Sequence, residues 1–199
     1  SKNNPYAVHL HRQLELICVL SGSTTVTVEQ KDFVLKPGEG VLVFPNQMHS
    51  LKNVEPGQNL LCIFEPDFCH SFRRFFQNKK PSHNAFSEAF LTGHSRIALE
   101  ELTRLAAAME KDRPTPSDVQ LYAEGYLTLL LADLLPTLPL QSGQSTDDLE
   151  LEQRLLLYLD AHYTEELSLE SLSREFGVSR FVLSRIFTEK LHTTFPDYV

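Results

Sequence analysis

Residues 168–187 read SLESLSREFGVSRFVLSRIF, and this stretch decides how the C-terminal part of the chain folds. Ser168 and Ser179 each precede an apolar stripe with helical spacing, and serine is a preferred N-cap residue. Gly177 lies between the stripes, where a glycine readily adopts the positive φ that ends a helix. The stripes consist of Leu169, Leu172 and Phe176, then of Leu183, Ile186 and Phe187. Two short helices joined by a glycine-containing turn predict a helix-turn-helix.

The second of these helices has an outward face that suits nucleic acid. With Leu183 at the centre of the buried face, a turn of about 100° per residue places Phe181, Ser184, Arg185 and Thr188 on the opposite side. Arginine can read guanine edges in the major groove, and an aromatic ring can contact thymine methyl groups. A packing module in which Phe181 lies against a neighbouring element is the alternative. The predicted DNA-binding residues are Ser179, Arg180, Phe181, Ser184, Arg185 and Thr188, with Arg180 acting mainly on phosphate.

The stretch from Leu167 to Val199 resembles the first helix-turn-helix of AraC-type (AraC/XylS) transcription regulators. The residues that carry the resemblance are Ser179, Arg180, Phe181, Leu183, Arg185, Phe187 and Tyr198. Members of that family have two such motifs joined by a long helix, and each motif reads a segment of the major groove. The sequence ends at Val199, about where the connecting helix is expected, so the resemblance covers the first motif only.

The N-terminal third has the pattern of a small antiparallel β-structure. Residues 14–20 are apolar, residues 23–29 alternate threonine and valine, and further short strands are expected at 33–36, 41–44 and 59–64. Breaks at Pro37-Gly38 and Pro45-Asn46 separate them. Short strands at this spacing predict a sandwich or barrel, and the family resemblance implies the cupin-type sensor barrel of AraC-type regulators.

Helical periodicity begins after about residue 84. One amphipathic helix is expected around 97–111 and a second at 117–135, ended by Pro136. The second helix carries more leucine than one partner helix can cover, which favours a homodimer contact. Residues 138–148, which follow this helix, have the composition of a linker. The predicted organisation is α+β: a cupin-like barrel at 1–80, a helical dimerisation region at 81–137, a linker at 138–148 and a DNA-binding domain at 149–199.

Residues 9–15, HLHRQLE, contain the candidate site of the barrel. His9, His11 and Glu15 share odd parity, so in a regular strand all three would point to one face. Their spacing resembles the first cupin motif, which Gly22 completes, and His49 matches the histidine of the second motif, followed by Asn53. Three imidazoles and one carboxylate suit a divalent metal such as Zn²⁺, Ni²⁺, Fe²⁺ or Mn²⁺. A hydrogen-bonding pocket without metal is the alternative interpretation.

Composition limits the remaining possibilities. The formal net charge is −8, but Ser179–Lys190 holds three basic residues and one acid, so a locally basic face is expected. Cys18, Cys62 and Cys69 lack metal-type spacing and suggest reduced thiols in a cytoplasmic protein. No apolar run is long enough for a membrane span.

Together these patterns predict a DNA-binding transcription regulator rather than an enzyme. It would respond to a small polar effector, such as a sugar derivative, and would contact RNA polymerase if it is an activator. The alternative is a metal-dependent cupin enzyme, an oxygenase or sugar isomerase, with a helical tail. The outward Phe181 and Arg185 favour the regulator.

Overall fold

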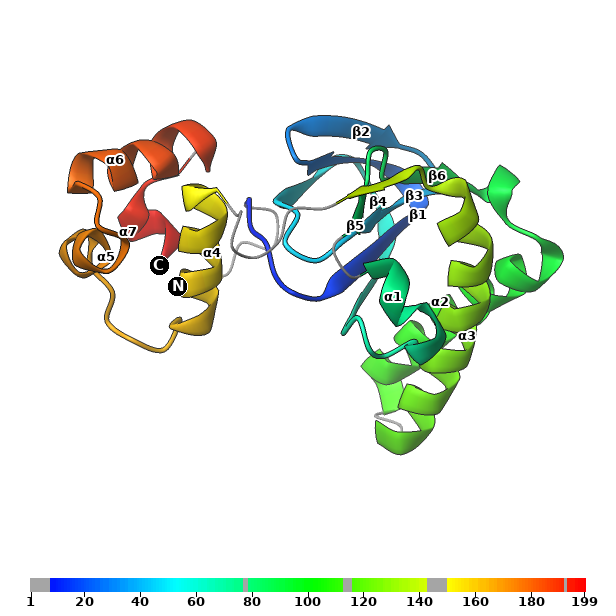
Figure 1. Cartoon of the computed structure of the whole chain (residues 1–199). Helices are drawn as coiled ribbons and strands as arrows, with labels where there is room; N and C mark the ends of the chain where they lie inside the picture. Colours follow the sequence, from blue (N-terminus) through cyan, green and yellow to red (C-terminus); the bar gives the residue numbers. More distant parts are fainter. Residues whose placement is uncertain (1–7, 77–78, 113–115, 143–149, 192) are drawn as a thin grey trace.

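The computed structural model describes residues 8–76, 79–112, 116–142, 150–191 and 193–199. It confirms the expected α+β class: an antiparallel sheet flanked by helices is followed by a separate group of C-terminal helices (Figure 1). The strands are β1 (Leu14–Val28), β2 (Lys31–Leu35), β3 (Glu39–Val43), β4 (His49–Phe64), β5 (Lys79–Pro81), β6 (Ala85–Ser87) and β7 (Leu140–Ser142).

The helices of the N-terminal part are η1 (His70–Phe72), α1 (Arg73–Phe76), η2 (Glu88–Phe90), α2 (Gly93–Asp112) and α3 (Pro116–Thr137). Those of the C-terminal part are α4 (Leu151–Ala161), α5 (Leu169–Phe176), α6 (Arg180–Arg185), the π-helical turn η4 (Ile186–Lys190) and α7 (Phe195–Tyr198). None of the described helices combines the length and apolar character needed to cross a membrane.

Strand β1 organises the sheet. It pairs with β2, β3 and β4, all antiparallel, and β6 extends the sheet beyond β3. The two strands expected at 14–20 and 23–29 are in fact one strand with register shifts between Val19 and Thr24. Gly22 therefore does not end a strand, as its place in the motif suggested. It has φ +74° within the irregularity, and a Cβ there would lie 2.5 Å from the Pro56 carbonyl oxygen.

The two faces of the sheet bury different sets of side chains. One face carries Glu15 and His49 among aliphatic residues that are at most 6% exposed: Ile17, Val19, Val26, Val28, Val41, Val43 and Leu51. The opposite face carries Leu14, Leu16, Leu42 and Phe44 and packs against α2 and α3. Cross-strand pairs such as Glu15–Val43 and Val28–His49 keep each set on its own side.

The leucines of α3 have a different role from the one expected. Leu127, Leu130, Leu131, Leu134 and Leu135 are at most 3% exposed, because they fill the core between the sheet and α2. Their number therefore does not by itself favour a second subunit, since the sheet covers them, and the homodimer stays a prediction. The apolar residues that α3 leaves exposed are Leu121, Tyr122 and Leu129. Helix α3 also continues through Pro136 to Thr137 instead of stopping before it.

The expected linker begins later than residue 138. Leu140–Ser142 forms β7, which pairs with β5 next to the barrel. Leu138 is buried in the core against the sheet. The rest of the expected linker, from residue 143 on, and the first seven residues of the expected barrel lie outside the described residues.

Helices α5 and α6 are joined by a short turn at Gly177, which is the arrangement expected for a helix-turn-helix. The Ser168 hydroxyl accepts a hydrogen bond from the Ser171 amide at 3.0 Å, and the Ser179 hydroxyl accepts one from the Val182 amide at 3.3 Å. Gly177 ends α5 in the left-handed region with φ +65°. These caps were expected from the sequence and are confirmed. The core under the motif joins Leu155, Leu156, Leu172, Leu183, Ile186 and Phe187.

This helical core extends onto the barrel. Leu10 is 3% exposed and belongs to the same cluster as the leucines of α4, and Met48 packs against that cluster. The Gln153 side chain of α4 donates a hydrogen bond to the Asn46 carbonyl oxygen at 3.2 Å. The helix-turn-helix domain is thus docked on two barrel segments, residues 8–10 and 46–48.

Candidate functional site

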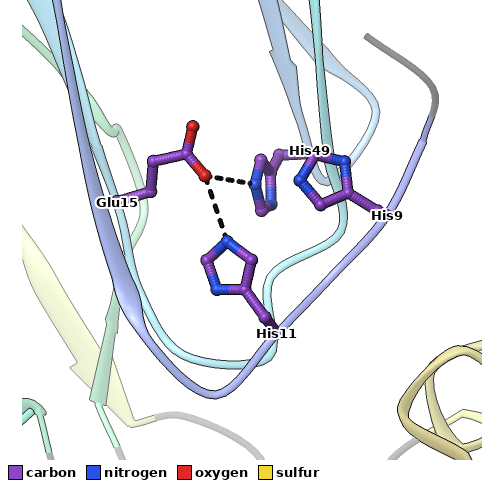
Figure 2. Close-up of side chains that lie close together, drawn as sticks. All are labelled: His9, His11, Glu15 and His49. Carbon is purple, nitrogen blue, oxygen red and sulfur yellow. Dashed lines mark hydrogen bonds and ion pairs between the residues drawn. The ribbon is translucent and has the colours of Figure 1, made fainter. Parts of the chain in front are cut away.

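Four predicted residues come together at the mouth of the barrel. His9, His11, Glu15 and His49 each offer a ligand atom, and these atoms all lie within 4.8 Å of one another. The ring centroids of His9 and His49 are 4.2 Å apart, and those of His11 and His49 are 5.0 Å apart. Figure 2 shows the three rings and the carboxylate converging from three segments of the chain.

Three different segments supply these side chains. Glu15 lies on β1 and His49 begins β4, whereas His9 forms an isolated antiparallel bridge with His49, with backbone N–O distances of 2.9 and 2.8 Å. His11 lies in the bend that precedes β1. The equal-parity argument was therefore wrong in its geometry, because strand β1 starts only at Leu14. The group is assembled by pairing of the N-terminal segment with β4. Asn53 instead bonds Thr24 farther along the sheet.

Backbone carbonyl groups set the tautomers of two histidines. The Nδ1–H of His11 donates to the Gln13 carbonyl at 3.1 Å, and the Nδ1–H of His49 donates to the Gln47 carbonyl at 2.9 Å. In a neutral imidazole the other nitrogen, Nε2, then carries only a lone pair. Both Nε2 atoms lie 3.0 Å from the same oxygen of Glu15, Oε2.

The lone pairs of the two Nε2 atoms and of Glu15 Oε2 point toward one another, so they repel unless a positive charge lies between them or the histidines are protonated. Protonated histidines would supply it as ion pairs with Glu15, and a divalent cation would supply it by accepting all three lone pairs. Carbonyl groups that hold the distal N–H of a histidine are the usual second layer of a metal site. Here the backbone carbonyls of Gln13 and Gln47 would form that second layer, and no sequence pattern predicted them.

Glu15 is ionised in this environment. Burial raises the pKa of its carboxyl group, but the hydrogen bonds and charges of His11 and His49 outweigh that effect and lower the pKa to about 2. Its side chain is 5% exposed and that of His49 is 2% exposed, so the carboxylate has little contact with water. A buried carboxylate beside three imidazoles is a donor set for a divalent ion, and the carboxylate offsets one of the ion's two positive charges.

These four residues fit a divalent transition metal. Ligands at about 2.1 Å from a metal and at right angles to each other are about 3.0 Å apart, which is the spacing between Glu15 Oε2 and each Nε2. Three nitrogens and one oxygen suit Zn²⁺, Ni²⁺, Fe²⁺ or Mn²⁺. A metal held there would provide open coordination positions for water or a small anionic or hydroxylated ligand.

The predicted DNA-reading face lies in the C-terminal group of helices, on α6 and η4. Phe181 is 71% exposed although Leu183, two residues later, is fully buried. Ser179, Arg180, Ser184, Arg185 and Thr188 are all exposed too, so all six predicted residues are accessible to a partner. Val182, 38% exposed, borders this surface and was not predicted.

The bases of this face are paired with acids, which the charge count did not reveal. Arg180 pairs with Glu170 of α5 at 2.9 Å, and Arg185 pairs with Glu189 through two hydrogen bonds. The positive charge of the expected basic face is therefore partly offset by these acids, and its arginines are held in defined orientations.

Comparison with known proteins assigns the N-terminal part. Residues 5–64 match the family model of the cupin domain, which confirms the predicted barrel type. No curated protein matches the chain.

Similar solved structures include two kinds of protein. The AraC-like transcriptional activator CuxR has 14% identity over 89% of this chain, with a TM-score of 0.45, and this chain covers 61% of its length. ToxT from Vibrio cholerae O395 has 12% identity over 97% of this chain and 71% of its own, with a TM-score of 0.44. Oxalate decarboxylase from Bacillus subtilis has 20% identity over 48% of this chain and 24% of its own, with a TM-score of 0.27.

Proposed function

We propose that the protein is an AraC-type transcription regulator that binds DNA through α6 and senses a small ligand at the cupin site. The observation that carries this proposal is the exposed face of α6. Phe181 is 71% exposed beside Arg185 on a helix that is capped by Ser179, so its ring buries little apolar area in the isolated chain and is available to a partner. On DNA the same ring would contact thymine methyl groups or sugars in the major groove.

The ligand site and the DNA reader share a physical connection. The paired segments 8–10 and 46–49 place His9 and His49 on one side, while Leu10 and Met48 pack on the helical domain. In an extended segment, alternate residues point to opposite sides. A ligand that draws His9 and His49 together would therefore change the surface on which α4 is docked. Such a ligand shifts the docking equilibrium by its difference in affinity for the two arrangements.

The chemistry of the site limits the ligand. Behind Glu15 the barrel face is filled by Ile17, Val41 and Val43, none of them exposed. We infer that the effector is a divalent metal or a small polar molecule bound at the mouth, through the metal or directly to the histidines. A sugar derivative remains within this class because its hydroxyl groups can occupy open metal positions.

A metal-dependent cupin enzyme is the second candidate, because the four-residue donor set is also what such an enzyme needs. The helix-turn-helix separates the two functions, since an enzyme gains nothing from the outward Phe181 and Arg185. We also propose that the protein is cytoplasmic and homodimeric, with the exposed Leu121, Tyr122 and Leu129 of α3 at the contact. An activator of this kind would contact RNA polymerase.

The direct test is selection of DNA from a random duplex library by the purified chain. Wild-type protein is expected to enrich a defined sequence at low salt. The Arg185→Ala variant should bind that sequence about tenfold more weakly or worse and lose preference at one base. Arg180→Ala should weaken binding to all sequences and reduce the dependence on salt. A wild-type chain that enriches no sequence at low salt would refute the DNA-binding function.

A further inference from the structure

Three side chains form a row on the exposed face of α6 and η4. Phe181, Arg185 and Glu189 are spaced four residues apart, so they lie one above the other on the helix surface. The Arg185 guanidinium carbon lies 6.0 Å from the centre of the Phe181 ring. On its other side, Arg185 Nε donates to Glu189 Oε1 at 2.9 Å and Nη2 donates to Oε2 at 2.8 Å.

This pairing uses one particular edge of the guanidinium. A guanidinium has five N–H groups, and the side-on pair with Glu189 uses one on Nε and one on Nη2. Both N–H groups of Nη1 and the second N–H of Nη2 stay available, and the end-on edge consists of one N–H from each of these two nitrogens. Guanine presents two adjacent acceptors, N7 and O6, in the major groove, and the end-on edge can bond both.

Glu189 also has a cost for DNA binding. Its carboxylate is 56% exposed on a helix that would face phosphates in the proposed function, and its other charged neighbour is Lys190, which pairs at 3.8 Å with Glu152. A residue kept only for affinity would not be an acid at this position, because it repels the DNA backbone. An acid that fixes the orientation of a base-reading arginine trades affinity for selectivity.

We propose that Glu189 is a positioning residue that presents the end-on edge of Arg185 to guanine, so that one position of the DNA site is a strongly required guanine. The role rests on the proposed DNA-binding function. Phe181 supports the arginine from the opposite side and lies against the neighbouring base or sugar. Glu189 itself makes no contact with the base.

The test compares base preference with overall affinity. Wild type, Glu189→Gln and the control Glu166→Gln, which removes an exposed acid outside the reading face, would each select DNA from the same random library. For Glu189→Gln, preference for guanine at one position should fall about fivefold or more, while affinity for random duplex at low salt stays equal or rises. Glu166→Gln should keep the full preference.

A double-mutant cycle shows whether Glu189 acts through Arg185. Adding Glu189→Gln to Arg185→Ala should change base preference no further, because the group being positioned is gone. Unaltered guanine preference in Glu189→Gln would overturn the proposal, and so would an equal loss of affinity for every sequence, as expected for a purely structural role. A wild-type chain that selects no DNA would instead refute the proposed function itself, and this role with it. Melting temperatures of the single variants should match wild type, since an exposed ion pair adds little stability.

Discussion

Leu10→Ala tests the docking of the helix-turn-helix domain on the barrel. Leu10 is 3% exposed and packs in the cluster of Leu155, Leu156 and Leu159, so the change removes three buried carbon atoms from the interface. At about 0.8 kcal/mol for each buried carbon, docking should lose about 2.4 kcal/mol. The equilibrium constant for docking should fall roughly 50-fold, because each 1.4 kcal/mol corresponds to a factor of ten.

Small-angle X-ray scattering measures this directly. The variant should show a larger radius of gyration than wild type, while the circular dichroism of the folded parts stays the same. Val34→Ala is the matched control, because Val34 is 62% exposed on β2 and its truncation should leave the scattering curve unchanged. Gln153→Ala approaches the same interface from α4, by removing the bond to the Asn46 carbonyl. If the Leu10→Ala and Gln153→Ala variants both give the scattering curve of wild type, the contacts of Leu10 and Gln153 do not hold the C-terminal helices against the barrel.

Two further predictions concern the helical layer. Leu130→Glu should unfold the N-terminal part, since a charge would replace a fully buried side chain at a cost of several kcal/mol. Leu129→Glu changes a side chain that is 46% exposed, so this variant should stay folded. If α3 forms the dimer contact, the Leu129→Glu variant should sediment as a monomer. A Leu130→Glu protein with a normal melting curve would contradict the placement of that residue. Hydrogen bonds from Ser95 and Thr92 lower the pKa of Asp133 below its usual value of 3.8, so its contribution to stability is present above that value and is lost as the pH falls through the lowered pKa. Asp133→Asn should therefore melt at a lower temperature than wild type at pH 6, and the difference should shrink toward pH 3; a difference that does not depend on pH would contradict this.

The C-terminal motif could be predicted from sequence because its signals are local. Ser168, Gly177 and Ser179 act on backbone groups within three to five residues, so each cap and turn is encoded by its own neighbourhood. The exposed Phe181 also followed from helical geometry alone. The acids that pair with Arg180 and Arg185 were visible in the sequence, but only the three-dimensional arrangement shows that they meet.

The sheet and the site depend on contacts between distant segments. Residues 49–58 of β4 are mostly polar and contain a Pro-Gly pair, so no periodicity marked them as a strand; pairing with β1 along its whole length holds them extended. The site had the right residues but the wrong geometric reason, because the bridge between His9 and His49 joins positions 40 residues apart. The leucine-rich helix α3 shows the same limit. Its composition predicts that its leucines are buried, but not which part of the protein buries them.

The central claim is that the cupin site controls a DNA reader, and the most direct test is DNA affinity measured with the site loaded and unloaded. Fluorescence anisotropy with the selected duplex would compare wild type with the His9→Ala/His11→Ala double variant, each stripped with chelator and then titrated with Zn²⁺, Mn²⁺, Ni²⁺ or Fe²⁺ under anaerobic conditions. Wild-type affinity should change about fivefold or more with at least one of these metals, in line with typical coupling free energies, and the double variant should not respond. If wild type binds metal and DNA but has the same DNA affinity with and without metal, control by a metal at this site is contradicted. Equal metal content in wild type and the double variant would contradict the metal site itself.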